Sequence, residues 1–144
     1  MILDNQLNFS AAQALSATGA STNYVDLTSD RNIGIGEPLV AVVTVDVALA
    51  GTSPTFAFAI QMDDNTSFSS PTSVATSQTY SGAAAVPAGA RFVLPVPMDT
   101  SGERYTRLNY TLGGTTPTVT VTAFLQPARM VQNDGVFADS LSLY

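Results

Sequence analysis

The sequence contains no cysteine, no histidine and no tryptophan. Without cysteine the chain forms no disulfide, and without cysteine and histidine it lacks the usual ligands of zinc and haem. The same absence excludes catalytic systems of the Ser-His-Asp and Cys-His kinds. There is also no tryptophan platform for a sugar ring. We therefore expect a protein that is not an enzyme and that carries no cofactor.

Charged residues are few. They make up 11% of the sequence, against roughly 25% in ordinary globular domains. All the basic residues are arginine, and the formal net charge is −6. A chain this acidic is repelled by phosphate backbones, so we expect no nucleic acid partner. A weakly charged surface suits close packing against other proteins, although an ordinary threonine-rich β-sandwich would have the same composition.

Long apolar runs are missing as well. No run reaches the ~18 residues that span a bilayer, so we expect no membrane partner. The first basic residue is Arg31, so the positively charged start of a signal peptide is absent. This pattern predicts a protein that is intracellular, or viral and assembled inside a cell.

The clearest pattern that is present is an alternation in residues 55–62. Large apolar side chains occupy every second position, and small or polar ones lie between them. Because successive side chains of a strand point to opposite faces, the segment predicts a strand with one face on a core. The other face is expected to meet solvent or a partner. The large residues are Phe56, Phe58, Ile60 and Met62.

Residues 39–50 are almost continuously apolar. Such a run indicates a central strand that is covered on both faces. Asp46 shares a face of this strand with Val40 and Val42. We therefore expect the end of that face near Asp46 to be exposed to solvent.

Shorter segments complete a set of about seven or eight strands separated by turns, which is typical of a sandwich or jelly roll. The fold class is therefore predicted to be all-β, as a single-domain antiparallel jelly roll or β-sandwich over residues 1–144. Two prolines in residues 91–97 predict an edge strand or a bulged strand there. The remaining segments are residues 21–27, 74–80, 104–112 and 118–125.

Glycine and proline mark the expected connections. Residues 51–54 are predicted to be a turn. Residues 113–117 are predicted to join residues 104–112 and 118–125 as an antiparallel hairpin. The small residues 81–89 predict a mobile loop.

The two ends are expected to extend beyond the predicted strands of the sandwich. Residues 1–20 predict an N-terminal arm or a short helix, because Ser10 and Gln13 have the spacing of a capping box; residues 1–9 could alternatively be an edge strand. Residues 126–144 are too apolar for a free tail, so they are expected to pack on the domain or on a neighbour.

Two groups of charged or polar residues are candidate sites. Asp63, Asp64 and Asn65 could offer oxygen ligands to calcium, but the spacing of a known calcium loop is missing. A turn held by bonds from side chain to backbone explains them better. Arg104 and Arg107 are expected on opposite faces of a strand, with Arg107 favoured as a contact to a partner.

Several short segments come in an order that is typical of a known family. They are AAQAL at 11–15, STNYVDL at 21–27, GIGEPL at 34–39, QMDDNTSFSSPT at 61–72, LPVP at 94–97, ERYTRLNY at 103–110 and TAFL at 122–125. From about Leu7 to Leu125 the chain resembles the capsid cement (head decoration) proteins of tailed bacteriophages, the group similar to the Bordetella phage cement protein.

The resemblance implies a jelly-roll protein on the outer surface of the phage head, assembled in the host cytoplasm. It implies binding across adjacent major capsid proteins and stabilisation of the expanded, DNA-filled shell, without catalytic residues. Self-association as a dimer or trimer would add further links. The residues expected at capsid or oligomer interfaces are Ile2, Leu3, Leu7, Phe9, Arg107, Phe137, Leu141, Leu143 and Tyr144.

Two other classes stay open at this point. Jelly rolls also serve as carbohydrate- or receptor-binding modules, against which the missing tryptophan and histidine count. A hydrolase would need carboxylates such as Asp63 or Glu103.

Overall fold

The computed structural model describes residues 5–27, 38–97 and 102–131. Regular structure in this part of the chain is almost entirely strand, so the predicted all-β class is confirmed. Residues 128–131 are helical. The other elements are the 3-10 helix η1 (Asn5–Leu7) and the strands β1 (Asn8–Leu15), β2 (Gly19–Ala20), β3 (Val25–Asp26), β4 (Leu39–Asp63), β5 (Thr72–Thr76), β6 (Tyr80–Ser81), β7 (Arg91–Pro95) and β8 (Tyr105–Pro127).

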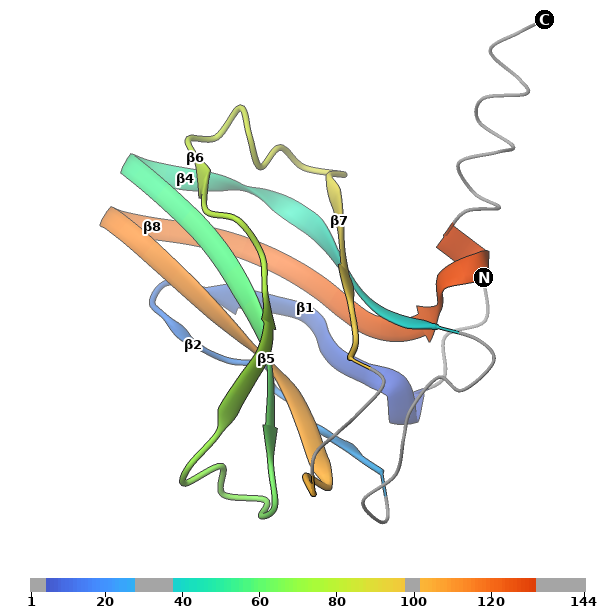
Figure 1. The fold of residues 1–144 in the computed structure, drawn as a ribbon. Coiled ribbons are helices and arrows are strands. Elements are labelled where there is room, and N and C mark those ends of the chain that lie inside the picture. The colour runs from blue at the N-terminus through green and yellow to red at the C-terminus, as the bar shows by residue number, and fades with distance from the viewer. Residues whose placement is uncertain (1–4, 28–37, 98–101, 132–144) are drawn as a thin grey trace, which may run out of the picture.

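Two very long strands, β4 and β8, organise the molecule. They pair antiparallel from Leu39 opposite Pro127 to Asp63 opposite Tyr105, with shifts of register between Val45 and Thr55. Figure 1 shows both strands running out to one side of the molecule, bending there and returning. The two halves of each strand therefore lie in different layers.

This bend corrects two predictions. Residues 113–117 do not join a hairpin, and residues 51–54 do not end a strand. The two irregular segments pair with each other instead, with Thr52 opposite Thr115 and Thr55 opposite Gly113. Their glycine and threonine residues bend a two-stranded ribbon, whereas the sequence pattern indicated separate turns.

The bent ribbon gives each layer its two central strands. The first layer has the order β1, β8, β4 and β7, and it holds residues 39–45 of β4. The second layer holds residues 55–63 of β4, with β5 and β6 beside them. In that layer β2 and β3 pair with residues 105–110 of β8. The arrangement is the sandwich that the sequence predicts.

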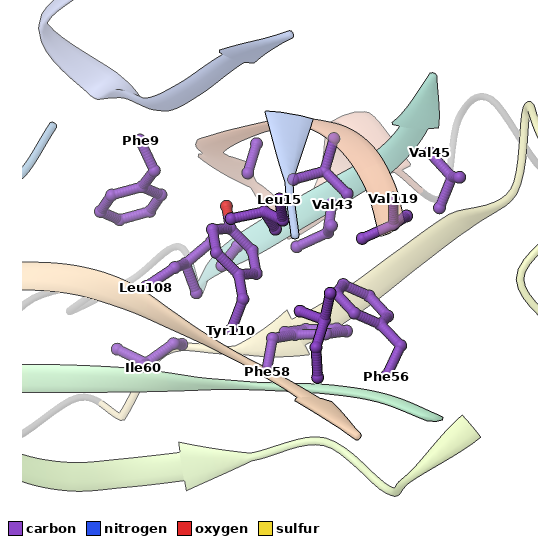
Figure 2. Packing of buried hydrophobic residues seen from close by; sticks show 14 of the residues in the cluster. Phe9, Leu15, Val43, Val45, Phe56, Phe58, Ile60, Leu108, Tyr110 and Val119 are labelled. Atoms are coloured by element: carbon purple, nitrogen blue, oxygen red, sulfur yellow. The ribbon is translucent and has the colours of Figure 1, made fainter. Parts of the chain in front are cut away.

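The core lies between the two layers. Figure 2 shows Phe56, Phe58 and Tyr110 of the second layer pointing toward Val43 and Val119 of the first. The rings of Phe56 and Tyr110 are stacked, with centroids 6.2 Å apart. Fully burying a side chain of this kind contributes roughly 1.5–3 kcal/mol. The alternation in residues 55–62 is confirmed, because its four large side chains are at most 1% exposed.

The prediction of a strand covered on both faces is also confirmed. On the outer face of the first layer, Val40, Val42 and Phe124 form a second buried cluster, against which Ala128 and Val131 pack. Asp46, further along that face, is exposed. The end of this face near Asp46 is therefore exposed to solvent, as the sequence predicted.

The N-terminal segment is a strand, so the helix predicted within residues 1–20 is wrong. Phe9 of β1 is fully buried, and β1 pairs with β8. The Ser10 hydroxyl donates to Gln13 Oε1 at 2.7 Å and lies 2.8 Å from the Tyr110 hydroxyl. Gln13 Nε2 donates to the Ala20 carbonyl at 3.0 Å. The two residues with capping-box spacing thus tie β1 to the core and to β2, and residues 8–15 are part of the sandwich instead of an arm.

The loop predicted to be mobile at residues 81–89 is pinned to the sandwich. Val86 is fully buried. The Leu49 amide donates to the Val86 carbonyl at 3.1 Å, and the Gly89 amide donates to the Val45 carbonyl at 2.7 Å. Small side chains allow this close approach, so composition alone was misleading here.

The short strands are shorter than their sequence patterns. Residues 21–27 contain only β3, and residues 74–80 are divided between β5 and β6. Within the described residues β7 pairs only with β4, which confirms an edge strand at Pro95.

Two glycines allow the bend of the ribbon. Gly51 has φ 130° and Gly114 has φ 96°, a region that side chains with a Cβ rarely adopt. A Cβ on Gly114 would lie 2.5 Å from the Ser53 carbonyl oxygen, and one on Gly51 would lie 2.9 Å from the Thr115 oxygen. The two strands therefore touch through their backbones at the bend.

Replacing Gly114 should destabilise the protein more than replacing a glycine with the same backbone and open surroundings. We expect Gly114→Ala to cost about 2–4 kcal/mol, because it adds overlap to conformational strain. Gly82 has φ 83°, and a Cβ at that position would meet nothing within 4 Å, so Gly82→Ala should cost only about 1 kcal/mol. Denaturant unfolding measures both, and equal costs would contradict the close approach at the bend.

Candidate functional site

A row of five aromatic and arginine side chains lies at one end of the second layer. We call it the arginine–aromatic row, and its members are Arg104, Tyr105, Tyr24, Phe68 and Arg107. The Arg104 guanidinium carbon is 5.0 Å from the centre of the Tyr105 ring. The ring of Tyr24 is 5.6 Å from that of Tyr105 and 6.1 Å from that of Phe68. The Arg107 guanidinium carbon is 4.2 Å from the centre of the Phe68 ring.

Three distant parts of the chain supply this row. Tyr24 directly precedes β3, which pairs with the start of β8. Tyr105 and Arg107 lie at the start of β8, and Arg104 directly precedes that strand. Phe68 lies in the loop between β4 and β5. In Figure 1 this loop and the start of β8 are both at the lower end of the molecule. Tyr24 is 45% exposed, whereas Phe68 is 7% exposed.

Arg104 has a carboxylate partner inside the chain. Its Nε donates to Asp26 Oδ1 at 2.7 Å and its Nη2 donates to Asp26 Oδ2 at 2.9 Å. The hydrogen bonds to Asp26 raise the pKa of Arg104 above its usual value. Both side chains are more than a third exposed, so this pair contributes little to stability. Its effect is to fix the guanidinium over Tyr105.

Arg107 is held differently. Its Nε donates to Gln61 Oε1 at 3.0 Å, and its guanidinium lies close enough to the Phe68 ring for a cation–π contact. Burial lowers the pKa of Arg107, and attraction by Asp63 opposes this effect. The group stays charged at neutral pH, because arginine does not deprotonate in proteins. Within residues 5–27, 38–97 and 102–131, the structure gives its two Nη groups no hydrogen-bond acceptor.

The turn after β4 is closed by Asp63. Its side chain is 1% exposed. Asp63 Oδ1 accepts hydrogen bonds from the Asn65 amide at 3.2 Å and from Asn65 Nδ2 at 2.8 Å, and Oδ2 accepts one from the Ser70 amide at 2.9 Å. Burial by itself would raise the pKa of Asp63, but the hydrogen bonds with Ser70, Asp64 and Asn65 outweigh it and hold the pKa below the ordinary value of 3.8.

These bonds bear on the two interpretations of Asp63, Asp64 and Asn65. Both carboxylate oxygens of Asp63 already accept hydrogen bonds from N–H groups of the turn. The described residues contain no group of three or more acidic side chains that could hold a metal ion. The structure therefore favours the turn over the calcium site.

The residues that the sequence predicted at interfaces differ in how exposed they are. Leu7 is 36% exposed and remains available, whereas Phe9 is fully buried in the core, so its prediction as a contact is wrong. Arg107 is half-buried at the surface, in the row described above. The remaining expected residues, Ile2, Leu3, Phe137, Leu141, Leu143 and Tyr144, lie outside the described residues.

Sequence reasoning missed Tyr24, Phe68 and Tyr105 as parts of a site. The one signal available was Phe68, a large aromatic residue in a loop of aspartate, asparagine and serine. Such a residue has no place in an alternating strand, so it must either be buried locally or serve a contact. Its contacts with Tyr24 and Arg107 come from distant segments and could not be read from the local pattern.

The role of the Asp63 turn can be tested by pH. We expect Asp63→Asn to lower stability at pH 7, because an amide presents an N–H to one of the N–H donors that now bond the carboxylate. The folded-state pKa of Asp63 is lowered, so its stabilising effect is complete above the ordinary pKa and is lost as pH falls through the folded value. The difference between wild type and variant in urea unfolding should therefore shrink below about pH 4.

The neighbouring Asp64 is the control for this measurement. It is exposed, and it accepts a hydrogen bond only from Asn65 Nδ2, at 2.9 Å, among the bonds of the turn. Because Asp64 also helps to lower the pKa of Asp63, Asp64→Asn should have some effect, but it should change the urea midpoint at pH 7 clearly less than Asp63→Asn does. A variant at Asp63 that behaves like the one at Asp64 would show that the buried carboxylate does not hold the turn.

Comparison with known proteins identifies the family. A family model described as Bbp16 matches residues 9–125, which is most of the chain. No curated protein matches the sequence. No helix among the described residues is long and apolar enough to cross a membrane. The chain belongs to the Bbp16 family, a Bordetella phage protein family, and this membership indicates a phage virion protein.

Proposed function

We propose that the protein is a capsid cement, or decoration, protein. It binds the outer surface of the phage head across adjacent major capsid proteins and stabilises the expanded, DNA-filled shell. The observation that carries this proposal is the Bbp16 match over residues 9–125. It covers nearly the same segment as the resemblance to cement proteins, which runs from about Leu7 to Leu125.

The physical character of the chain supports this role. A cement protein needs a stable fold and a contact surface, and it needs no reaction centre. Here the two layers enclose a large apolar core, and the surface carries few charges. A net charge of −6 gives the protein no electrostatic reason to bind the packaged genome.

The mechanism proposed for stabilisation is differential binding. An epitope shared between neighbouring capsid proteins exists only where those proteins are correctly spaced. A protein that binds the expanded spacing better than the unexpanded one shifts the shell toward expansion by that difference in affinity. Simultaneous contacts to two capsid proteins gain strength from the high effective concentration of the second site.

The proposal also covers catalysis and self-association. The protein is not an enzyme and uses no cofactor, which agrees with the lack of histidine and cysteine. It self-associates as a dimer or trimer, which would add contacts around a symmetry axis of the shell. Sedimentation velocity of the purified protein measures the second statement directly.

A carbohydrate- or receptor-binding module is the second candidate. The observation that favours it is Tyr24, whose exposed ring lies beside charged side chains in the arginine–aromatic row. An aromatic face next to hydrogen-bonding groups is a reasonable surface for a sugar. A glycan array with the purified protein tests this candidate.

Co-sedimentation with phage heads tests the cement proposal. Heads that lack the protein are prepared in expanded and unexpanded forms, and purified protein is added over a range of concentrations. We expect saturable binding to expanded heads, weaker binding to unexpanded heads, and survival of the decorated heads at higher temperature. Heads that already carry the protein are the matched control and should bind little more.

The outcomes are distinct. Equal binding to both head forms would contradict stabilisation by differential affinity. An absence of binding to either form would reject the cement role, and clean hits on the glycan array would then favour the second candidate.

A further inference from the structure

We propose that Arg107 is the point at which the protein recognises a single carboxylate of the major capsid protein. This inference rests on the cement function and adds the contact that would carry it. The arginine–aromatic row would then face the phage head. The aromatic side chains near Arg107 would surround the contact with the carboxylate.

The two arginines of the row differ in how many of their donors are already used. Arg104 donates two hydrogen bonds to the Asp26 carboxylate, from Nε at 2.7 Å and from Nη2 at 2.9 Å. Within residues 5–27, 38–97 and 102–131, Arg107 donates a hydrogen bond only through Nε, to Gln61. A guanidinium is shaped to bind a carboxylate through two parallel hydrogen bonds. In Arg107 the Nη groups that could make such bonds are unbonded within the part of the chain that the structure describes.

Asp63 is the acidic side chain that attracts Arg107. Its oxygens accept hydrogen bonds from Asn65 and Ser70, and no ion pair joins it to Arg107 among the described residues. Asp63 therefore balances part of the charge of Arg107 without occupying its donors. Among the residues that the structure describes, no partner of the Nη groups would have to be displaced by an outside acceptor.

The Arg107 side chain is held in place by its neighbours. Gln61 and Arg107 lie opposite each other on β4 and β8, and the Phe68 ring supports the guanidinium at 4.2 Å. Phe68 itself has φ 48°, a left-handed conformation that is costly for a large residue and persists only where the surroundings hold it. An arginine held in place loses less side-chain freedom on binding than a flexible one.

The surroundings of Arg107 limit what the partner can be. Asp64 is exposed on the adjoining turn, where Asn65 Nδ2 donates to both Asp63 and Asp64. These carboxylates would repel a run of acidic residues. Tyr24, at 45% exposure, offers an apolar face nearby. The structure thus fits one carboxylate flanked by apolar side chains, and tyrosine and arginine are the residue types that most often dominate binding at interfaces.

The test uses full-length variants on expanded heads that lack the protein. Arg107→Gln should weaken binding about 10- to 100-fold and should flatten the dependence of affinity on salt. Arg107→Lys keeps the charge but loses the fork, so it should bind between wild type and Arg107→Gln. Arg91→Gln, on β7 of the other layer, removes the same charge and should bind like wild type.

A second arm identifies the acceptor. Head carboxylates are converted to amides with a carbodiimide and glycinamide, and binding of wild type and Arg107→Gln is compared on native and amidated heads. If Arg107 contacts a carboxylate, amidation should weaken wild type more than the variant, since the variant has already lost that contact. Equal weakening of both would overturn the proposal, because the acceptor would then not be a carboxylate.

The failures of the two proposals can be told apart. If wild type does not bind heads, the cement function fails, and this inference fails with it. If wild type binds and Arg107→Gln binds equally well, only the contact assigned to Arg107 is wrong. Thermal unfolding of each variant is measured first. If Arg107→Gln unfolds at a clearly lower temperature than wild type, Arg107→Lys replaces it in the test. Its binding to native and amidated heads is then compared with that of wild type.

Discussion

The structure depends on the continuous pairing of β4 with β8 through their common bend. Each strand is a central strand of both layers, so the backbone hydrogen bonds of one ribbon run through the whole sandwich. In a sandwich of separate strands, the layers are joined by loops and by packing of side chains. Here the layers are also joined by a hydrogen-bonded ladder, and the close backbone approach at Gly51 and Gly114 is the condition for it.

The same ladder sets the geometry of the arginine–aromatic row. Gln61 faces Arg107 and Asp63 faces Tyr105 across the ribbon in the second layer. A slip of one residue would turn Arg107 toward the core and Leu108 toward solvent, because neighbouring side chains of a strand point to opposite faces. The buried positions of Leu108 and Tyr110 oppose such a slip. The core therefore determines where the surface arginine points.

This division explains how much the sequence could predict. Burial of alternate residues is a local property, so residues 55–62 and the two-sided burial of residues 39–45 could be predicted correctly. The bend could not, because residues 113–117 resemble a turn until they are paired with residues 51–54 some sixty positions earlier. Ser10 and Gln13 misled for a similar reason: their side chains bond Tyr110 and Ala20, which local spacing does not reveal. The contacts of Tyr24 and Phe68 are equally non-local.

On the proposed function, a modest contact at Arg107 serves the protein better than a very strong one. A decoration protein that must discriminate expanded from unexpanded shells can shift that equilibrium only by the difference between its two affinities. A single strong contact to one capsid protein would be made on both shells and would add nothing to this difference. Several moderate contacts on neighbouring subunits become strong together only when the spacing is right. A rigid surface with few charges and the well-held guanidinium of Arg107 suits this requirement, because each contact is specific in geometry while none of them suffices alone.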